Sequence, residues 1–320
     1  MKVAAIQMTA ELGNVKANLK SAKQLANNVF KEGAELVILP EFFTSAVCFH
    51  PKMLDVVSPI NGEPTQVLNQ LAKKYNGTIG GSFIALRGKE SYNTFVLTFP
   101  DGSLYFHDKD QPTMWENCYY IGGTDDGVLE TKIGNIGAVL CWEFVRSRTA
   151  IRMLNRVDFV VGGSCWWSLP EQPLGGTPSE LRDKTLEMMI ETPAKFARML
   201  GVHVIHAAHA GDFDGEMPLM PDFQYKSYYV GETQIVDGSG KILARMKRED
   251  GEGFITADIE IKRKWNPSEA IPDRFWIPDM PLELNQAWEL LNNHGESYYR
   301  ETTKPYREKH PVEENKTKHV

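Results

Sequence analysis

Short apolar runs alternate with segments of helical periodicity along most of this chain, and that alternation constrains the fold more than any other feature of the sequence. Residues 2–8 and 35–40 are apolar runs of the kind that buried strands carry. Between them, apolar residues recur every three or four positions from Val15 to Phe30, and Gly33 closes this segment as a helix. Further strands are predicted at 78–86, 92–99, 104–107, 136–140, 157–163, 202–208, 231–236, 241–246 and 254–259, and helices at 66–75, 147–155 and 181–200. This alternation predicts an α/β fold built of layers.

The character of the sequence changes near residue 262. Residues 1–262 carry the alternating pattern and form one predicted domain, whereas residues 263–320 are rich in Pro, Trp and charged side chains. One helix is predicted near 282–291, and residues 313–320 have the composition of a disordered end. The aromatic residues of this C-terminal extension lead us to expect that it packs on the body or on a neighbouring subunit.

The composition argues against several functional classes. The 320 residues carry a net charge of -7 with no basic stretch, so nucleic acid is not expected as a partner. No apolar run approaches the ~18 residues of a membrane span, and the first residues are too interrupted for a signal peptide. The four cysteines form no CxxC pair and lie at no zinc-ligand spacing from a histidine. We therefore expect a cytoplasmic protein with reduced thiols, no membrane partner and no metal.

One of these cysteines lies at a position typical of functional residues. The apolar run 136–140 ends on Cys141, and Ser147 then opens a helical pattern as its expected N-cap. Cys141 would thus lie at the carboxyl end of a buried strand, the edge at which ligands bind in open α/β sheets. The alternative interpretation is a small buried hydrophobe that happens to be cysteine.

Three charged residues occupy similar positions. Glu41 directly follows the run 35–40, Lys109 ends the strand predicted from residue 104, and Glu116 lies seven residues farther along. Each of them alone would be interpreted as a solvated loop or surface charge. Together with Cys141 they supply a thiol, a carboxylate that can take its proton, and an ammonium group that can stabilise an oxyanion.

Several motifs, in this order along the chain, resemble those of the nitrilase, or carbon–nitrogen hydrolase, superfamily. They are AAIQM from Ala4, ILPEFF around Glu41, DKDQPT around Lys109, the loop that carries Glu116, and GAVLCWEF around Cys141. The resemblance covers about residues 1–262. It implies a four-layer α-β-β-α sandwich with the site between the sheets, and chemistry that needs no cofactor.

The same resemblance implies a role for each matching residue. Cys141 corresponds to the nucleophile, Glu41 to the general base, and Lys109 to the cation that stabilises the oxyanion. Glu116 resembles the second glutamate of the family, which orients the site, and the backbone N–H of Trp142 would complete the oxyanion hole. The implied reaction is hydrolysis of a carbon–nitrogen bond in a small amide or nitrile, through an acyl-thioester and with release of ammonia or an amine.

Details of the motifs bear on the substrate. CWE at the cysteine and K-x-x-P-T from Lys109 resemble true nitrilases, but nitrilases usually carry Asn where this chain has Phe144 and Arg where it has Asp108. Strand alternation predicts that the Asp108 side chain points away from Lys109. Amides and nitriles both stay open as substrates. Transfer of the acyl group to another acceptor and a catalytically silent binding protein also stay open.

Aromatic residues near the predicted site suggest an aromatic substrate pocket, although each could equally belong to the core or to a subunit contact. They are Trp115, Tyr119, Trp166 and Trp167. Cys118 and Cys165 are interpreted as spectator thiols. His203, His206 and His209 share a predicted strand in which His206 faces the opposite side, so we expect no metal site there.

The helix predicted after Cys141 bears on assembly. It carries Ile151, Met153 and Leu154 on more than one side, so it needs two surfaces to bury them. Members of the family that the motifs resemble commonly dimerise through this helix. We therefore expect a homodimer or a larger homo-oligomer.

Overall fold

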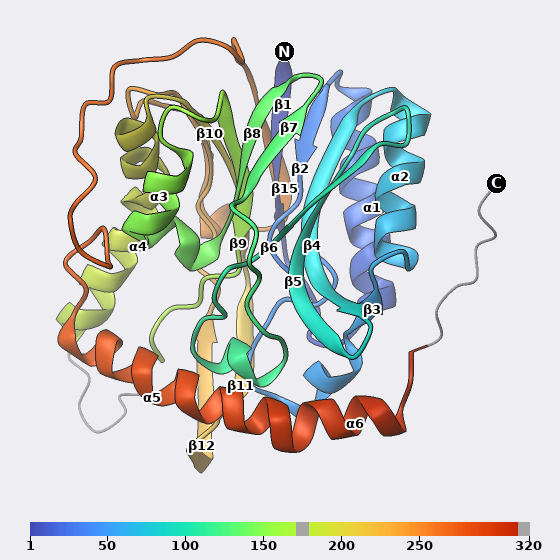
Figure 1. Cartoon of the computed structure of the whole chain (residues 1–320), viewed down its shortest axis with the longest axis vertical. Coiled ribbons are helices and arrows are strands. Elements are labelled where there is room, and N and C mark those ends of the chain that lie inside the picture. The colour runs from blue at the N-terminus through green and yellow to red at the C-terminus, as the bar shows by residue number, and fades with distance from the viewer. Residues whose placement is uncertain (171–178, 313–320) are drawn as a thin grey trace.

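Two sheets pack face to face, with helices on both outer surfaces, in the computed structural model, which describes residues 1–170 and 179–312 (Figure 1). The strands of the first sheet are, in spatial order, β6 (Leu104–Asp108), β5 (Glu90–Thr98), β4 (Thr78–Arg87), β2 (Leu36–Ile38), β1 (Lys2–Met8) and β15 (Gly253–Asp258), with β3 (Ser58–Pro59) beside β4. Those of the second are β7 (Val128–Thr131), β8 (Gly134–Leu140), β9 (Phe159–Ser164), β10 (His203–His209), β13 (Thr233–Val236) and β14 (Ile242–Met246). The two sheets join where β1 and β10 pair in parallel at Gln7 with Ala208 and at Met8 with His209.

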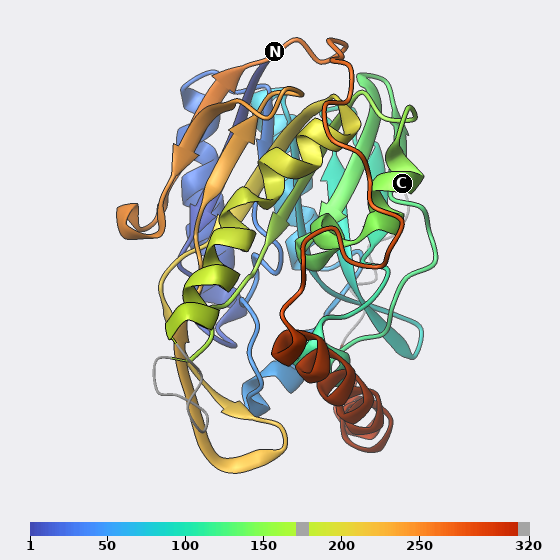
Figure 2. The same cartoon turned by 90° about the vertical axis from the view of Figure 1, so that its left-hand side faces the viewer.

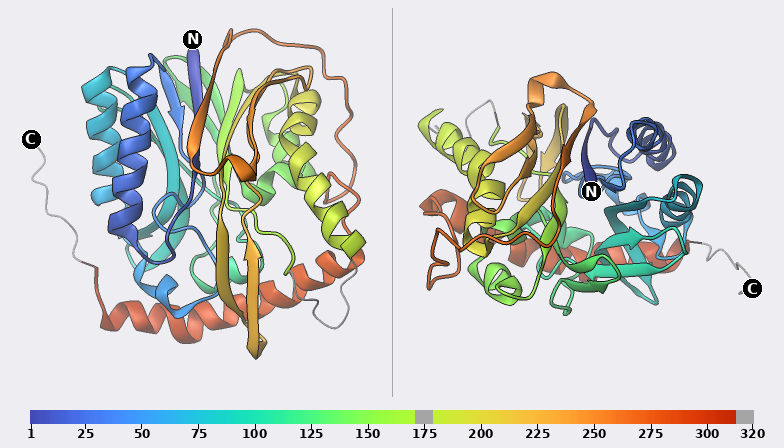
Figure 3. Two further views of the ribbon diagram at one scale, coloured as in Figure 1. Left: turned by 180° about the vertical axis from the view of Figure 1, so that it is seen from behind. Right: turned by 90° about the horizontal axis from the view of Figure 1, so that it is seen from above.

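The helices form the two outer layers. Figure 3, seen from above, shows α1 (Val15–Lys31) and α2 (Glu63–Tyr75) on one side of the sheets, with α3 (Ser147–Met153) and α4 (Ser179–Leu200) on the other. In Figure 2, α4 lies diagonally across the second sheet. The expected four-layer α-β-β-α sandwich is therefore confirmed.

Both faces of the central strands are buried, which explains why they appear as continuous apolar runs in the sequence. In β1, Val3 and Ala5 pack between the two sheets, whereas Ala4 and Ile6 pack in the cluster beneath α1 and α2. In β8, residues on the two faces divide in the same way between the inter-sheet core and the α3–α4 side. One apolar strand thus serves two layers at once.

The carboxyl ends of several parallel strands gather at one edge, the lower edge in Figure 1. Glu41 lies three residues beyond β2, Lys109 directly after β6 and Cys141 directly after β8. The C-terminal elements run across this edge in Figures 1 and 3. They are α5 (Leu282–Tyr298), a π-helical turn η5 (Tyr299–Thr303) and α6 (Lys304–Lys309). The last described part of the chain therefore lies over residues that the sequence analysis singled out.

The segment after Cys141 differs from the prediction. A 3-10 helix, η3 (Cys141–Val145), lies between β8 and α3, so Arg146 is the N-cap of α3 and Ser147 is its first residue. The expected capping role of Ser147 is therefore wrong, because the prediction passed directly from strand to helix.

The remaining differences concern lengths and elements that were not predicted, among them β3, β7 and α6. Helix α5 extends to Tyr298, beyond the predicted end at residue 291. The antiparallel hairpin of β11 (Asp212–Met217) and β12 (Met220–Tyr228) was not predicted, because charged residues occupy exposed positions of β11. The disorder expected for residues 313–320 lies outside the described residues. Among the described helices, none combines the length and the apolar character that crossing a membrane requires.

Candidate active site

Cys141 occupies a strained turn at the end of β8, with a left-handed backbone φ of 51°. This conformation costs a residue other than glycine about 1–3 kcal/mol, so neighbouring groups must hold it. Glu143 does so: its Oε2 accepts the Leu140 N–H at 2.8 Å, and its Oε1 accepts the Asp110 N–H at 3.0 Å. One buried carboxylate thus fixes the Cys141 turn and ties it to the residue after Lys109.

His107 balances the charge of Glu143. Its Nε2 lies 3.0 Å from Glu143 Oε2 and its Nδ1 lies 2.5 Å from Asp125 Oδ1, with the imidazole fully buried. Burial disfavours the charged ring, but the two carboxylates outweigh burial and raise the pKa of His107 to about 10. The ring is therefore an imidazolium at neutral pH, and the support beneath Cys141 is a charge-paired network.

Lys109, Glu41 and Glu116 form a buried ion cluster next to Cys141. Lys109 Nζ donates to Glu41 Oε1 at 2.9 Å and to Glu116 Oε2 at 2.6 Å, and all three side chains are fully buried. A carboxylate oxygen of each glutamate and the Cys141 Sγ lie within 4.8 Å of one another. The fold therefore brings together the four residues that the sequence analysis selected.

Three further groups orient Glu41. Its Oε1 also accepts a hydrogen bond from Asn93 Nδ2 at 2.8 Å, and its Oε2 accepts the backbone N–H of Cys165 at 2.9 Å. His209 Nε2 donates to the Glu41 carbonyl oxygen at 2.7 Å. The sequence analysis missed Asn93 and His209, because nothing in the sequence shows that β5 and β10 contact the end of β2. Cys165 contributes its backbone to this arrangement.

Glu116 is held in a different way. Its Oε2 accepts the Thr113 N–H at 2.9 Å and the hydroxyl of Tyr120. Tyr119, the residue predicted for the substrate pocket, instead accepts the His50 N–H at 3.0 Å through its hydroxyl. The structure therefore places Tyr120, not Tyr119, against Glu116. Both tyrosines follow the 3-10 helix η2 (Met114–Cys118), which carries Glu116, and only the fold shows which of them turns back toward this glutamate.

The electrostatics of the cluster follow from burial and opposite charges. Burial is the largest influence on Glu41 and raises its pKa to about 7, although Lys109 opposes the shift. Burial also disfavours the charged form of Lys109, but Glu116 and Glu41 outweigh it, and the pKa of Lys109 lies above its ordinary value. Burial, reinforced by Glu41, holds the pKa of the Cys141 thiol well above its ordinary value. Cys141 therefore rests as a neutral thiol beside a carboxyl group that titrates near neutral pH.

Only one group of three donor residues in the described parts of the chain is compact enough to share a cation, and it is Glu41, Glu116 and Cys141. Lys109 Nζ already binds both carboxylates there, so positive charge is supplied by the protein itself. The three histidines of β10 do not form such a group: the His206 ring bonds to the Ser164 hydroxyl at 2.6 Å, whereas that of His209 bonds to the backbone.

The aspartates on either side of Lys109 are both neutralised elsewhere. Asp108 pairs with Arg87, so its side chain points away from Lys109, as strand alternation predicts. Asp110 is buried against Arg146; burial alone would raise its pKa, but Arg146 and neighbouring arginines outweigh burial and hold this pKa well below its usual range. Neither carboxylate therefore competes with Glu41 or Glu116 for Lys109.

An apolar pocket of about 150 Å³ is lined in part by chain neighbours of this cluster. Trp115, Trp142 and Trp167 line it, and the rings of Trp115 and Trp167 stack with their centroids 4.2 Å apart. Trp166 packs instead on a histidine of β10 and is not among the lining residues. Of the four aromatic residues predicted for a pocket, Trp115 and Trp167 thus lie in one, whereas Trp166 and Tyr119 do not. The side chain of Trp142 is an addition that the sequence analysis missed.

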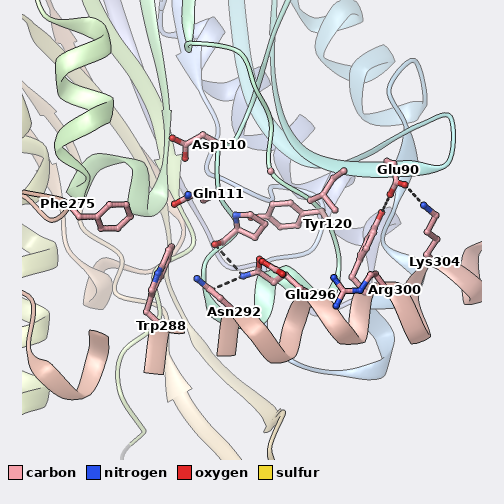
Figure 4. A pocket seen from close by; sticks show the side chains of 15 residues that line it. Glu90, Asp110, Gln111, Tyr120, Phe275, Trp288, Asn292, Glu296, Arg300 and Lys304 are labelled. Atoms are coloured by element: carbon pink, nitrogen blue, oxygen red, sulfur yellow. Dashed lines mark hydrogen bonds and ion pairs between the residues drawn. The ribbon is translucent and has the colours of Figure 1, made fainter. Parts of the chain in front are cut away.

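A larger groove of about 690 Å³ is lined mainly by residues within 110–122 and by residues of the C-terminal elements (Figure 4). Gln111 and Tyr120 line one wall, Asn292 of α5 lines the opposite wall, and the ion pair of Glu90 with Lys304 lies at one end. None of the four clustered residues is among the lining residues of this groove or of the aromatic pocket. The smaller aromatic pocket is the better candidate for holding a substrate, because its walls are mainly apolar and aromatic, as is typical of small-molecule sites, whereas charged and amide side chains line much of the groove.

Residues 2–263 match the family model of carbon-nitrogen hydrolases. The chain belongs to the carbon–nitrogen hydrolase family. Among solved structures, it is similar to a carbon–nitrogen hydrolase from Helicobacter pylori G27, with a TM-score of 0.70 and 20% identity over 82% of this chain and 89% of that one. An amidase from Nesterenkonia sp. AN1 is similar with a TM-score of 0.61 and 16% identity, over 90% of this chain and 99% of that one. At these identities, the structures show a shared fold.

Curated members of the family with similar sequences include both nitrilases and amidases. A probable nitrilase of Schizosaccharomyces pombe is 25% identical over 51% of this carbon–nitrogen hydrolase and 63% of its own length. An N-carbamoylputrescine amidase of Oryza sativa subsp. japonica is 29% identical over 39% of this chain and 45% of its own. Nitrilase 3 of Arabidopsis thaliana is 24% identical over 82% and 79%, respectively. The chain thus spans less than two thirds of the first two relatives.

Proposed function

We propose that this protein hydrolyses a non-peptide carbon–nitrogen bond in a small amide or nitrile through an acyl-thioester on Cys141. One observation carries the proposal: the Cys141 thiol and the carboxylates of Glu41 and Glu116 lie within 4.8 Å of one another, and Lys109 bridges the two carboxylates. This arrangement joins a nucleophile, a base and a fixed positive charge in a site without exposed surface.

In the first half-reaction on an amide, Glu41 accepts the thiol proton while Cys141 Sγ bonds to the carbonyl carbon. A carboxyl pKa of about 7 suits this role, because such a group can both take and return a proton near neutral pH. The negative charge on the substrate oxygen is stabilised by Lys109 and by the N–H of Trp142, in the first turn of η3, where intrahelical acceptors are missing. Glu41 then returns the proton to the leaving nitrogen, and ammonia or an amine departs.

In the second half-reaction, water attacks the thioester carbon while Glu41 takes a proton from it. The tetrahedral intermediate expels the sulfur, which regains its proton from Glu41, and the carboxylic acid leaves. A nitrile reaches the same thioester after attack on the nitrile carbon and addition of one water, which releases ammonia. Each turnover needs Cys141 as a reduced thiol, so we place the enzyme in a reducing compartment, the cytoplasm.

The reaction is tested by ammonia release from a panel of amides, carbamoyl amines and nitriles, together with mass spectrometry of the protein during turnover. We expect an adduct of the acyl mass on Cys141, absent from Cys141→Ala and present in the matched control Cys118→Ala. An amine acceptor added to the reaction separates hydrolysis from acyl transfer. If no substrate of the panel gives ammonia or an adduct, the protein is a silent relative and the proposal is wrong.

We also propose that two copies associate through α3. Ile151 on this helix is 60% exposed. Phe275 is 43% exposed, and its carbonyl oxygen accepts the N–H of Ser147, the first residue of α3. Large exposed apolar side chains on neighbouring segments favour a subunit contact over free solvent. Met153 of the same helix is buried within the protomer, so α3 has one apolar side on its own sheet and one free.

A further inference from the structure

Helix α5 forms one wall of the aromatic pocket. Leu284, Ala287 and Leu291 of this helix face Trp115, Trp142 and Trp167 across a volume of about 150 Å³. All three helix residues lie beyond residue 263, where the match to the family ends. The pocket is therefore completed by a part of the chain that the family pattern does not describe.

The pocket is built in part from chain neighbours of the reacting groups. Trp115 precedes Glu116 in the chain, and Trp142 follows Cys141. Trp167 lies two residues after Cys165, whose N–H holds Glu41. Cys141 and the three tryptophans belong to one buried apolar cluster. A substrate whose carbonyl or nitrile carbon meets Cys141 would therefore have its acyl group placed among these rings.

The chemistry of the walls selects the kind of acyl group. Among the described lining residues there is no lysine, arginine or histidine, and the one carboxylate, that of Glu283, lies on an exposed residue. A charged acyl group would lose its hydration without gaining a partner. An apolar cavity of about 150 Å³ is large enough to hold a benzene ring, and aromatic walls favour such a ring through offset or edge-on packing.

Helix α5 is held firmly in this position. The Trp288 ring stacks on Trp142 with a centroid distance of 5.5 Å and an interplanar angle of 4°. Asn292 Oδ1 accepts the Met114 N–H at 2.8 Å. Gly295 allows close approach, because a Cβ at this position would lie 2.5 Å from Asn117 Cβ. The wall is thus preformed, which lowers the cost of ordering it when a ligand binds.

We propose that this pocket binds the acyl portion of the substrate, that it selects a compact aromatic or similarly sized apolar group, and that α5 sets the size limit. The inference rests on the proposed function for its meaning in catalysis, since the pocket holds the part of the substrate that becomes the acyl group on Cys141. Ala287 is the residue of α5 at which added volume enters the pocket.

Binding is measured by calorimetry in Cys141→Ala, with phenylacetamide, acetamide and succinamate as probes. We expect phenylacetamide to bind at least about tenfold more tightly than the charged succinamate. Adding Ala287→Leu should weaken phenylacetamide binding by at least about tenfold and leave acetamide binding unchanged, because the three added carbons occupy the place of the ring. Gln286→Leu, which places the same leucine side chain at an exposed neighbouring position, is the control and should change neither.

Leu291→Ala provides a second variant if Ala287→Leu does not fold, and it should improve binding of the larger 1-naphthylacetamide. Equal affinity for the three probes, tighter binding of succinamate, or equal effects of Ala287→Leu and Gln286→Leu would overturn the proposal. Turnover is scored separately on the parent protein. Absence of ammonia and of an acyl adduct with every substrate rejects the proposed function, whereas turnover without preference for an aromatic acyl group rejects only the role of the pocket.

Discussion

Replacement of Lys109 by glutamine removes the one group that contacts both carboxylates of the site. Its Nζ lies 2.9 Å from Glu41 and 2.6 Å from Glu116, so at an effective dielectric constant of ~20 each contact is worth about 6 kcal/mol of Coulomb attraction. Desolvation of the buried ammonium offsets much of this energy, and removal of one partner of such a group typically costs about 3–5 kcal/mol of stability. We expect a loss of this size in Lys109→Gln.

Catalysis should suffer independently of stability. Loss of one oxyanion donor lowers kcat by about 10²–10³-fold, or ~3 kcal/mol. A second effect concerns Glu41: Lys109 lowers the pKa of this carboxyl group, so its removal should move that pKa upward from about 7. Because the ionised form of Glu41 is the base, the acidic limb of the profile of kcat/KM against pH should move to higher pH in Lys109→Gln.

The assay compares Lys109→Gln with Lys73→Gln, which removes the same charge from an exposed position on α2. Both variants are measured by ammonia release between about pH 5 and pH 9 and by urea unfolding at about pH 6 and pH 8, roughly one unit on either side of the pKa of Glu41. The stability loss in Lys109→Gln should be greater at the higher pH, where Glu41 is ionised and has lost its partner. Similar kinetics for the two variants, or an unmoved acidic limb, would remove Lys109 from the mechanism.

Three other predictions follow from the same geometry. Cys141→Ala should abolish turnover without loss of fold, because it removes the nucleophile. Cys165→Ala should keep most activity, because Cys165 bonds to Glu41 through its backbone N–H, which alanine retains. Equal inactivity of the two variants would show that the wrong thiol was assigned. Glu41→Gln should raise Tm relative to the parent more at about pH 8 than at about pH 5. Burial raises the pKa of Glu41 from 4.5 to about 7, so this carboxyl group contributes stability below pH 4.5 that is lost as the pH rises through 7. A difference in Tm that does not change with pH would contradict this. Ile151→Asp should shift the sedimentation coefficient from dimer to monomer and lower activity, since α3 follows the Cys141 turn; a fully active monomeric parent would exclude this contact.

The convergence of the four clustered residues could be predicted from the sequence, because parallel strands place their carboxyl ends on one edge of a sheet. Glu41, Lys109 and Cys141 each follow a strand of this kind, and Glu116 follows Lys109 closely enough to return to it. These are local relations between a residue and its own strand, which an apolar run in the sequence makes visible. The layer architecture was predictable for the same reason.

The contacts that orient these residues could not be predicted in this way, because they join distant segments. Asn93 and His209 reach Glu41 across separations of 52 and 168 residues. The choice between Tyr119 and Tyr120 depends on how the chain turns as it leaves η2, which carries Glu116, and a five-residue helix is too short for periodicity to show this. Glu143 stood within the recognised motif, yet its role as an acceptor for two backbone N–H groups appears only when the turn is seen in space.

Backbone strain is concentrated where these residues converge. Phe42, which follows Glu41, has a φ of 53°, Met114, two residues before Glu116, has a φ of 51°, and Cys141 itself has a φ of 51°. Each such residue costs about 1–3 kcal/mol and persists only where the surrounding structure holds it. Apolar strand ends alone do not require these conformations, so the strain is linked to the orientation of the carboxylates and the thiol.

Each strained turn is held by a side chain from a different part of the chain. Ser82 of β4 accepts the Phe42 N–H at 3.2 Å, Glu143 accepts the N–H that precedes Cys141, and Asn292 of α5 accepts the Met114 N–H at 2.8 Å. Two of these three supports come from within the segment that matches the family, and the third comes from the C-terminal helix beyond it. The same helix that lines the aromatic pocket therefore also fixes the turn that presents Glu116, so recognition of the acyl group and alignment of the carboxylate depend on one element.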